Sequence, residues 1–167
     1  ELEGTITITG GTFEINAVSD GIQACVILQI DGGDFDITAA EGLEATYILI
    51  NDGNITIDAT DDGINASRKS TACDIVIEFN GGDTKITMGQ GDTDGVDSNG
   101  TITMTGGYVT VDGTTSEMNS SIDFDGSFDI QGGTFIAAGS QGMAQTATTA
   151  SQSVIAVYLT SQQNADD

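Results

Sequence analysis

Apolar and polar residues alternate with a period of two along most of this chain. The segments Thr5-Ile6-Thr7-Ile8-Thr9 and Thr101-Ile102-Thr103-Met104-Thr105 are the clearest examples. Such alternation is typical of a β-strand with one buried face. Nowhere does a period of 3.6 residues outcompete it, so the pattern predicts an all-β protein.

A short phrase recurs along the chain, made of an acidic residue, a glycine, an apolar residue and a polar residue. Its copies are Asp20–Gln23, Glu41–Glu44, Asp62–Asn65 and Asp94–Asp97, with weaker copies at Ser121–Asp123 and Gln141–Ala144. The apolar residue stands at positions 22, 43, 64, 96, 122 and 143, which gives intervals of 21, 21, 32, 26 and 21. A period near 21 residues predicts stacked repeats. The glycine of each phrase is expected to form a corner.

A second corner is marked in each repeat by a glycine pair or an Asp-Gly pair, which permits the positive φ of a tight turn. Alignment on these pairs gives columns of apolar residues that are expected to face inward. The columns are Ile8, Ile30, Ile50, Phe79, Met104, Ile130; Ile6, Leu28, Ile48, Ile77, Ile102, Phe128; Phe13, Phe35, Ile55, Thr84, Val109, Phe135; Ile15, Ile37, Ile57, Ile86, Val111, Ala137; and Ile22, Leu43, Ile64, Val96, Ile122, Met143.

Together these patterns predict a parallel β-helix of about six coils, each of ~21 residues and three short strands. An antiparallel sandwich would instead predict hairpins. Residues 1–167 are expected to form a single β-helix domain, and because the chain begins without Met we expect a mature product or a fragment of a longer precursor. The longer intervals contain insertions at residues 67–71, 89–92 and 114–120.

Acidic side chains follow the same repeat. The residue after each inward apolar residue should point outward, and the acidic residue before each glycine lies at the corner, so neighbouring coils bring carboxylates about 5 Å apart. Such carboxylates repel one another unless they are protonated or share a cation. Hard oxygen ligands suit Ca²⁺. The outward column is Gln23, Glu44, Asn65, Asp97, Asp123 and Ala144, and the corner residues are Asp20, Glu41, Asp62 and Asp94, with Asp125 on the same coil as Asp123. The prediction is calcium binding along these aligned oxygens. The alternative is an acidic surface that is merely solvated, with Asp-Gly pairs serving turns.

Composition strengthens the case for a cation. The chain has 26 acidic and 3 basic residues, a formal net charge of −23, which attracts cations and repels nucleic acid and anionic membranes. No apolar run is long enough to span a membrane, and no signal peptide is visible. If vertically aligned, Cys25 and Cys73 should lie about 9–10 Å apart, beyond the ~7 Å limit of a disulfide. We therefore expect free thiols that face inward, unless the insertion at 66–73 folds back.

Catalysis finds little support in the sequence. Arg68 and Lys69 lie on an insertion, and carboxylates engaged with a cation are poor general acids. We therefore expect no enzyme activity and no catalytic residues.

Several phrases resemble a known family: Glu41–Glu44, Ile55–Ala66, Asp94–Gly100, Ile122–Gly126 and Gly142–Gln145. They are similar to the secreted bacterial acid-sugar-binding β-helix proteins, whose fold is pectate-lyase-like. The resemblance implies a right-handed parallel β-helix, bound Ca²⁺ and an extracellular or cell-surface location. Carried over to this sequence, it implies these calcium ligands: Glu41, Glu44, Asp62, Asn65, Asp94, Asp97, Asp123 and Asp125. It also implies binding of an acidic polysaccharide such as polygalacturonate without cleavage. Family members usually carry a long Gly- and Met-rich insertion where this chain has only Ser67–Thr71.

Two functional hypotheses follow. The first is calcium-dependent binding of an acidic, polygalacturonate-like polysaccharide, with calcium bridging protein and sugar. The alternative is a structural subunit of an extracellular filament or surface layer, in which β-helices stack end to end or exchange a terminal strand. Neither hypothesis involves nucleic acid or membrane insertion.

Overall fold

The computed structural model describes residues 4–89 and 94–161, so most of the expected insertion at 89–92 lies outside the described residues. Within these ranges the protein is all-β, and no helix that could cross a membrane is found there. The strands are β1 (Ile6–Asn16), β2 (Asp20–Gln23), β3 (Ile27–Ala39), β4 (Glu41–Ala45), β5 (Tyr47–Ala59), β6 (Ile64–Ala66), β7 (Val76–Phe79), β8 (Asp83–Met88), β9 (Val96–Ser98), β10 (Thr101–Met104), β11 (Tyr108–Asp112), β12 (Ile122–Phe124), β13 (Phe128–Ile130), β14 (Thr134–Ala138) and β15 (Thr149–Ala150).

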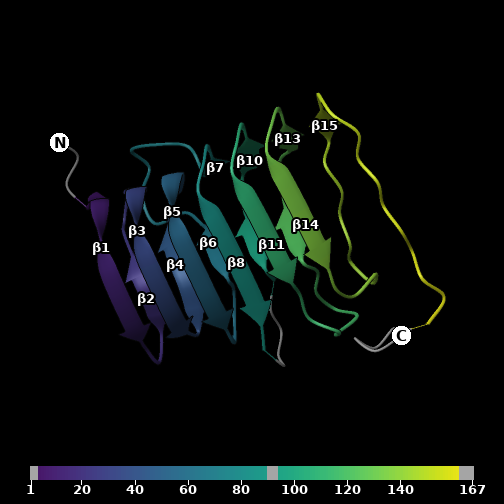
Figure 1. The fold of residues 1–167 in the computed structure, drawn as a ribbon, viewed down its shortest axis with the longest axis horizontal. Helices are drawn as coiled ribbons and strands as arrows, with labels where there is room; N and C mark the ends of the chain where they lie inside the picture. The colour runs from purple at the N-terminus through teal and green to yellow at the C-terminus, as the bar shows by residue number, and fades with distance from the viewer. Residues whose placement is uncertain (1–3, 90–93, 162–167) are drawn as a thin grey trace.

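These strands form a parallel β-solenoid of about five turns. Each strand of the described residues pairs in parallel with its counterpart in a neighbouring coil, as in β3 with β5 and β4 with β6. A sheet of ten strands carries the segments around the glycine pairs, and a sheet of five short strands, in the order β12-β9-β6-β4-β2, carries the repeated phrase. The coils follow one another along the long axis from β1 to β15 (Figure 1). The predicted parallel β-helix is confirmed.

The observed register confirms the predicted inward columns. For example, Ile30 pairs with Ile8 and Ile50, and Ile50 pairs in turn with Phe79. Leu43 and Ile64 are fully buried in the column of the five-stranded sheet. Because side chains of identical strand position stack directly over one another, the core is a continuous apolar rod.

Two details differ from the expectation of six coils with three short strands each. β1, β3 and β5 each run through the glycine or Asp-Gly pair as one continuous strand, with register shifts at the pair. In the later coils the chain forms two separate strands on either side of the pair, such as β7 and β8. Gly33 and Gly53 both have φ near +120° at this bend. The sixth copy of the phrase forms no strand, and Met143 is 52% exposed, so this column holds five strands in the part of the chain described.

The glycine of the repeated phrase has a different role from the expected one. Gly42 and Gly63 do not have positive φ, so they are not corner residues in the conformational sense. A Cβ on Gly42 would lie 2.4 Å from the carbonyl oxygen of Gly63 and 2.5 Å from a methyl of Ile57. Glycine is needed there because successive coils approach each other too closely for a side chain.

The two cysteines are free thiols, as predicted. The prediction that both face inward is wrong for Cys25, which is exposed, while Cys73 is partly buried. The Cys73 sulfur lies 3.7 Å from the carbonyl oxygen of Val26, because the segment after Ala66 folds back over the earlier coils.

Candidate cation-binding site

The outer face of the five-stranded sheet carries the predicted column of polar side chains. In register, Glu44 pairs with Asn65, Asn65 with Asp97, and Asp97 with Asp123. Contrary to a simple outward, solvated column, Glu44 is only 3% exposed and Asn65 only 8%. Buried charged or polar groups require partners, so the contacts along this face decide what it can bind.

At the N-terminal end of the column, three carboxylates form a cluster. Asp20, Glu41 and Glu44 each place a carboxylate oxygen within 4.8 Å of the others. Asp20 and Glu41 are paired residues of β2 and β4, and Glu44 lies at the end of the same short phrase as Glu41. We call these residues the Glu44 cluster.

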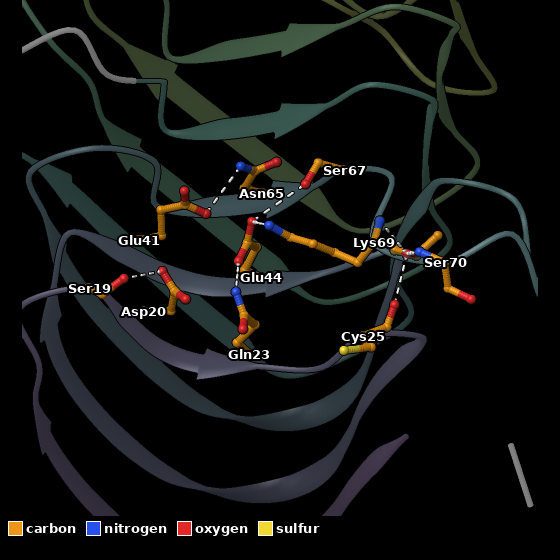
Figure 2. Close-up of polar contacts among 11 residues, drawn as sticks. Ser19, Asp20, Gln23, Cys25, Glu41, Glu44, Asn65, Ser67, Lys69 and Ser70 are labelled. Atoms are coloured by element: carbon orange, nitrogen blue, oxygen red, sulfur yellow. Dashed lines mark hydrogen bonds and ion pairs between the residues drawn. The ribbon is translucent and has the colours of Figure 1, made fainter. Parts of the chain in front are cut away.

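A lysine from the insertion enters this cluster. The Lys69 ammonium forms an ion pair with Glu44, which also accepts hydrogen bonds from the amide of Gln23 and the hydroxyl of Ser67 (Figure 2). Burial raises the pKa of Glu44, but the hydrogen bonds and charge of Lys69 and the Gln23 amide outweigh it, so this pKa lies below its ordinary value. Burial lowers the pKa of Lys69, but the hydrogen bond to Glu44 and the charge of Glu44 outweigh burial, so this pKa lies above its ordinary value.

Thr46 holds the backbone of Lys69 in place. Thr46, which is fully buried, accepts hydrogen bonds on its hydroxyl oxygen from the backbone N–H groups of Lys69 (3.0 Å) and Ser70 (2.9 Å). The same hydroxyl donates to the carbonyl of Cys25, at 2.9 Å. Thr46 therefore fastens the insertion over the sheet and aims Lys69 at Glu44.

The next part of the column, formed by Asp62, Asn65, Asp94 and Asp97, contains no basic side chain among the contacts described. We call it the central group. Asp62 accepts the backbone N–H of Asp94 at 3.1 Å, and Asp94 accepts the backbone N–H of Ser120 at 2.6 Å. The amide oxygen of Asn65 and one carboxylate oxygen of Asp97 are buried without a hydrogen-bond partner. Two orphaned, buried acceptors in one column fit a cation as their missing partner.

The electrostatics of this face agree with that fit. Burial, followed by the charges of neighbouring carboxylates, raises the pKa of Glu41, Asp62 and Asp97 to about 7 each. For Asp97 the largest of these charges is that of Asp123. A bound cation would reverse this repulsion, so oxygen ligands at this spacing suit a hard divalent ion.

The remaining predicted ligands lie at the edge of the column. Asp123 is paired with Asp97 in register and accepts a hydrogen bond from the Gln145 amide at 2.6 Å. Asp125 follows β12 and is exposed. The eight predicted residues therefore fall into the Glu44 cluster, the central group and this C-terminal pair.

The sequence prediction missed two members of the site. Asp20 was expected at the corner but not among the ligands, and Lys69 was expected only as an insertion residue. The signal that could have found Lys69 is its position: it lies four residues after Asn65 of the column, in a chain with only 3 basic residues.

Comparison with known protein families gives a match to this chain. A family of carbohydrate-binding domain-containing proteins matches residues 1–95, which include the Glu44 cluster and most of the central group. No match was found among curated proteins or among solved structures. Since the matched residues cover more than half of the chain, this protein belongs to the family of carbohydrate-binding domain-containing proteins.

Proposed function

We propose that this protein is an extracellular, non-catalytic module that binds acidic polysaccharide through Ca²⁺. The observation that carries the proposal is the pair of buried, unpartnered oxygens of Asn65 and Asp97 within a column of carboxylates. Family membership supports the sugar as partner, and the donor set supports the cation.

Within this proposal, Asp62, Asn65 and Asp97 hold the ion, with Asp94 and Asp123 beside them. Bound Ca²⁺ would supply positive charge that the carboxylates of the protein and those of the sugar can share. The oxygen of Asn65 is oriented because its amide nitrogen donates to Glu41 at 3.1 Å. The backbone N–H groups that bind Asp62 and Asp94 fix those carboxylates in the same way.

The net charge favours an acidic sugar that needs a bridging ion. A protein at −23 repels a polyuronate at long range unless cations lie between them. A polygalacturonate-like chain repeats a carboxylate on every sugar unit, so it can engage several positions along a solenoid face. The same charge offers a neutral glucan no comparable attraction.

The basic residues beside the column support binding without cleavage. Lys69 is engaged by Glu44, and the Arg68 guanidinium donates to the carbonyls of Ser70 (3.2 Å) and Cys73 (3.1 Å). Both are committed to holding the insertion in place. A general base for polysaccharide cleavage would have to be free to accept a proton from the sugar.

The test is retention on immobilised polygalacturonate compared with an uncharged glucan, in Ca²⁺ and in EDTA. We expect retention on polygalacturonate alone, lost in EDTA, with no shortening of the polymer after prolonged incubation. Equal retention on both polymers, or release of shortened chains, would contradict the proposal.

A second candidate function, self-assembly, is favoured by an apolar segment near the C-terminal end of the described residues. Ile155 is 85% exposed, Val157 72% and Leu159 53%, and the segment belongs to no strand (Figure 1). A run of exposed apolar residues of this kind is suited to adding a strand to the sheet edge of another copy.

The register of this segment supports strand addition. Ala150 pairs with Ile130, so it continues the column of Ile30 and Ile50. In the earlier coils, the next two inward-facing residues come five and seven positions after the residue that belongs to this column. After Ile30, for example, they are Phe35 and Ile37. Positions 155 and 157 stand at the same intervals after Ala150, so the segment carries the inward pattern of a further strand.

A further inference from the structure

We propose that the Lys69 ammonium is a tethered counterion that takes the place of a metal ion in the Glu44 cluster. Divalent cations are then confined in this chain to the central group, and Lys69 determines how many ions the column holds. The inference rests on the proposed function only for the choice of Ca²⁺ as the ion.

The geometry of the Glu44 cluster is that of a cation site already filled. Three carboxylate oxygens converge within 4.8 Å, and the ammonium of Lys69 is paired with the most buried of the three residues, Glu44. Removing a charge partner from a buried carboxylate is costly, because the carboxylate is left without compensation. A divalent ion would therefore have to displace Lys69 before it could bind Glu44.

The lysine is positioned by the fold and not by the ion pair alone. Thr46 binds the backbone of Lys69 and Ser70, and Arg68 binds the carbonyls of Ser70 and Cys73. These contacts keep the ammonium near Glu44 at high effective concentration, which gives an intramolecular cation an advantage over a dissolved one.

The central group provides the contrast within the same molecule. It continues the same column by one and two coils, yet the contacts described there include no lysine or arginine, and it contains the two unpartnered oxygens. Asn65 divides the column into these halves, because its amide nitrogen faces Glu41 while its amide oxygen is the orphaned acceptor. In one half the most buried carboxylate, Glu44, has an ammonium partner, whereas the two orphaned oxygens of the other half have no such partner.

The experiment replaces Lys69 by methionine, which keeps a long side chain and removes the charge. The matched control is Lys85→Met, an equal charge change at an exposed position of β8, away from the column. Calcium stoichiometry is measured by isothermal titration calorimetry. We expect one additional ion per chain in K69M and no change in K85M. A K69M protein with the stoichiometry and affinity of the wild type would overturn the inference.

Two further measurements separate this inference from the proposed function. Asp62→Asn with Asp97→Asn should abolish binding at the central group, and adding K69M to that background should restore one ion per chain. If the wild type binds no calcium while K69M binds one ion, the inference stands and the calcium bridge fails. If the wild type binds calcium and K69M gains no ion, the inference about Lys69 fails and the calcium bridge remains supported.

The melting temperature can be measured even for variants that fold poorly, so it provides a further test. In EDTA, K69M should melt below the wild type because Glu44 has lost its partner, and calcium should raise its melting temperature more than that of the wild type. Lys69→Arg keeps the positive charge and should behave as the wild type in stoichiometry. A K69M protein that remains unfolded in excess calcium would count against the inference.

Discussion

Individual carboxylates on one face of this protein lie in two different electrical environments. Glu44 has an ammonium partner and a lowered pKa, whereas Glu41, Asp62 and Asp97 have pKa values raised to about 7 by burial and by neighbouring negative charge. In the absence of a cation, the second set is strained by its own charge. Residue chemistry thus favours the presence of a cation at this face.

This difference predicts how stability depends on pH. The raised pKa values mean that the folded protein binds more protons than the unfolded chain between about pH 4 and about pH 7, so the free energy of unfolding falls as pH rises through that window. Glu44 acts in the opposite sense, but its contribution is lost only as pH falls toward its lowered pKa. In EDTA we expect a melting temperature several degrees lower at pH 8 than at pH 5.

Calcium should remove most of that difference, because a bound ion stabilises the ionised carboxylates. Thermal melts at the two pH values, with and without calcium, are sufficient to check this. A melting temperature in EDTA that is unchanged or higher at pH 8 would show that these carboxylates are not destabilising in the folded protein.

At the scale of elements, the coil-to-coil contact sets what each repeat must contain. Gly63 has no room for a Cβ, which would lie 2.4 Å from the carbonyl oxygen of Gly95 and 2.5 Å from a methyl of Ile86. Backbone atoms cannot move aside as a flexible side chain can. The glycine is therefore as much a packing residue as the buried Ile64 beside it.

Gly63→Ala should therefore destabilise the protein by about 3 kcal/mol or more, at the upper end of overpacking effects. Asp61→Ala, an exposed neighbour, should change stability by roughly 0.5 kcal/mol or less. Urea denaturation of both variants against the wild type is the measurement. If the two variants are equally stable, the close approach of the coils at Gly63 is not as described.

Sequence periodicity predicted the columns because the repeat itself encodes them. Once Ile8, Ile30 and Ile50 share a position in the period, stacking follows without tertiary information. The roles of Lys69 and Gly63 could not be read in the same way. The course of the insertion depends on hydrogen bonds to Thr46, and the need for glycine depends on a neighbouring coil's carbonyl. Both are contacts between coils that no local pattern records.

The apolar segment near residue 155 gives a prediction for the whole molecule. Ile155→Asp with Val157→Asp places charge at the inward positions of the proposed strand. The matched control, Ala156→Asp with Tyr158→Asp, places the same charge at the outward positions. Light scattering should show a wild-type mass that rises with protein concentration, more so at high ionic strength because each chain carries −23.

Only the variant that combines Ile155→Asp with Val157→Asp should remain monomeric. A wild type that stays monomeric across the concentration range, or equal losses in both double variants, would exclude strand addition through this register. The pattern of the two variants thus distinguishes a specific strand from a merely sticky apolar segment.

The central claim is that the protein binds acidic polysaccharide through a calcium ion held by the central group. Its most direct test is calorimetric titration of polygalacturonate into the wild type and into Asp97→Asn, each in calcium and in EDTA. We predict binding by the wild type in calcium, at least a tenfold loss in Asp97→Asn, and none by either protein in EDTA. Wild-type binding of equal affinity in calcium and in EDTA would exclude a calcium bridge between the protein and the sugar.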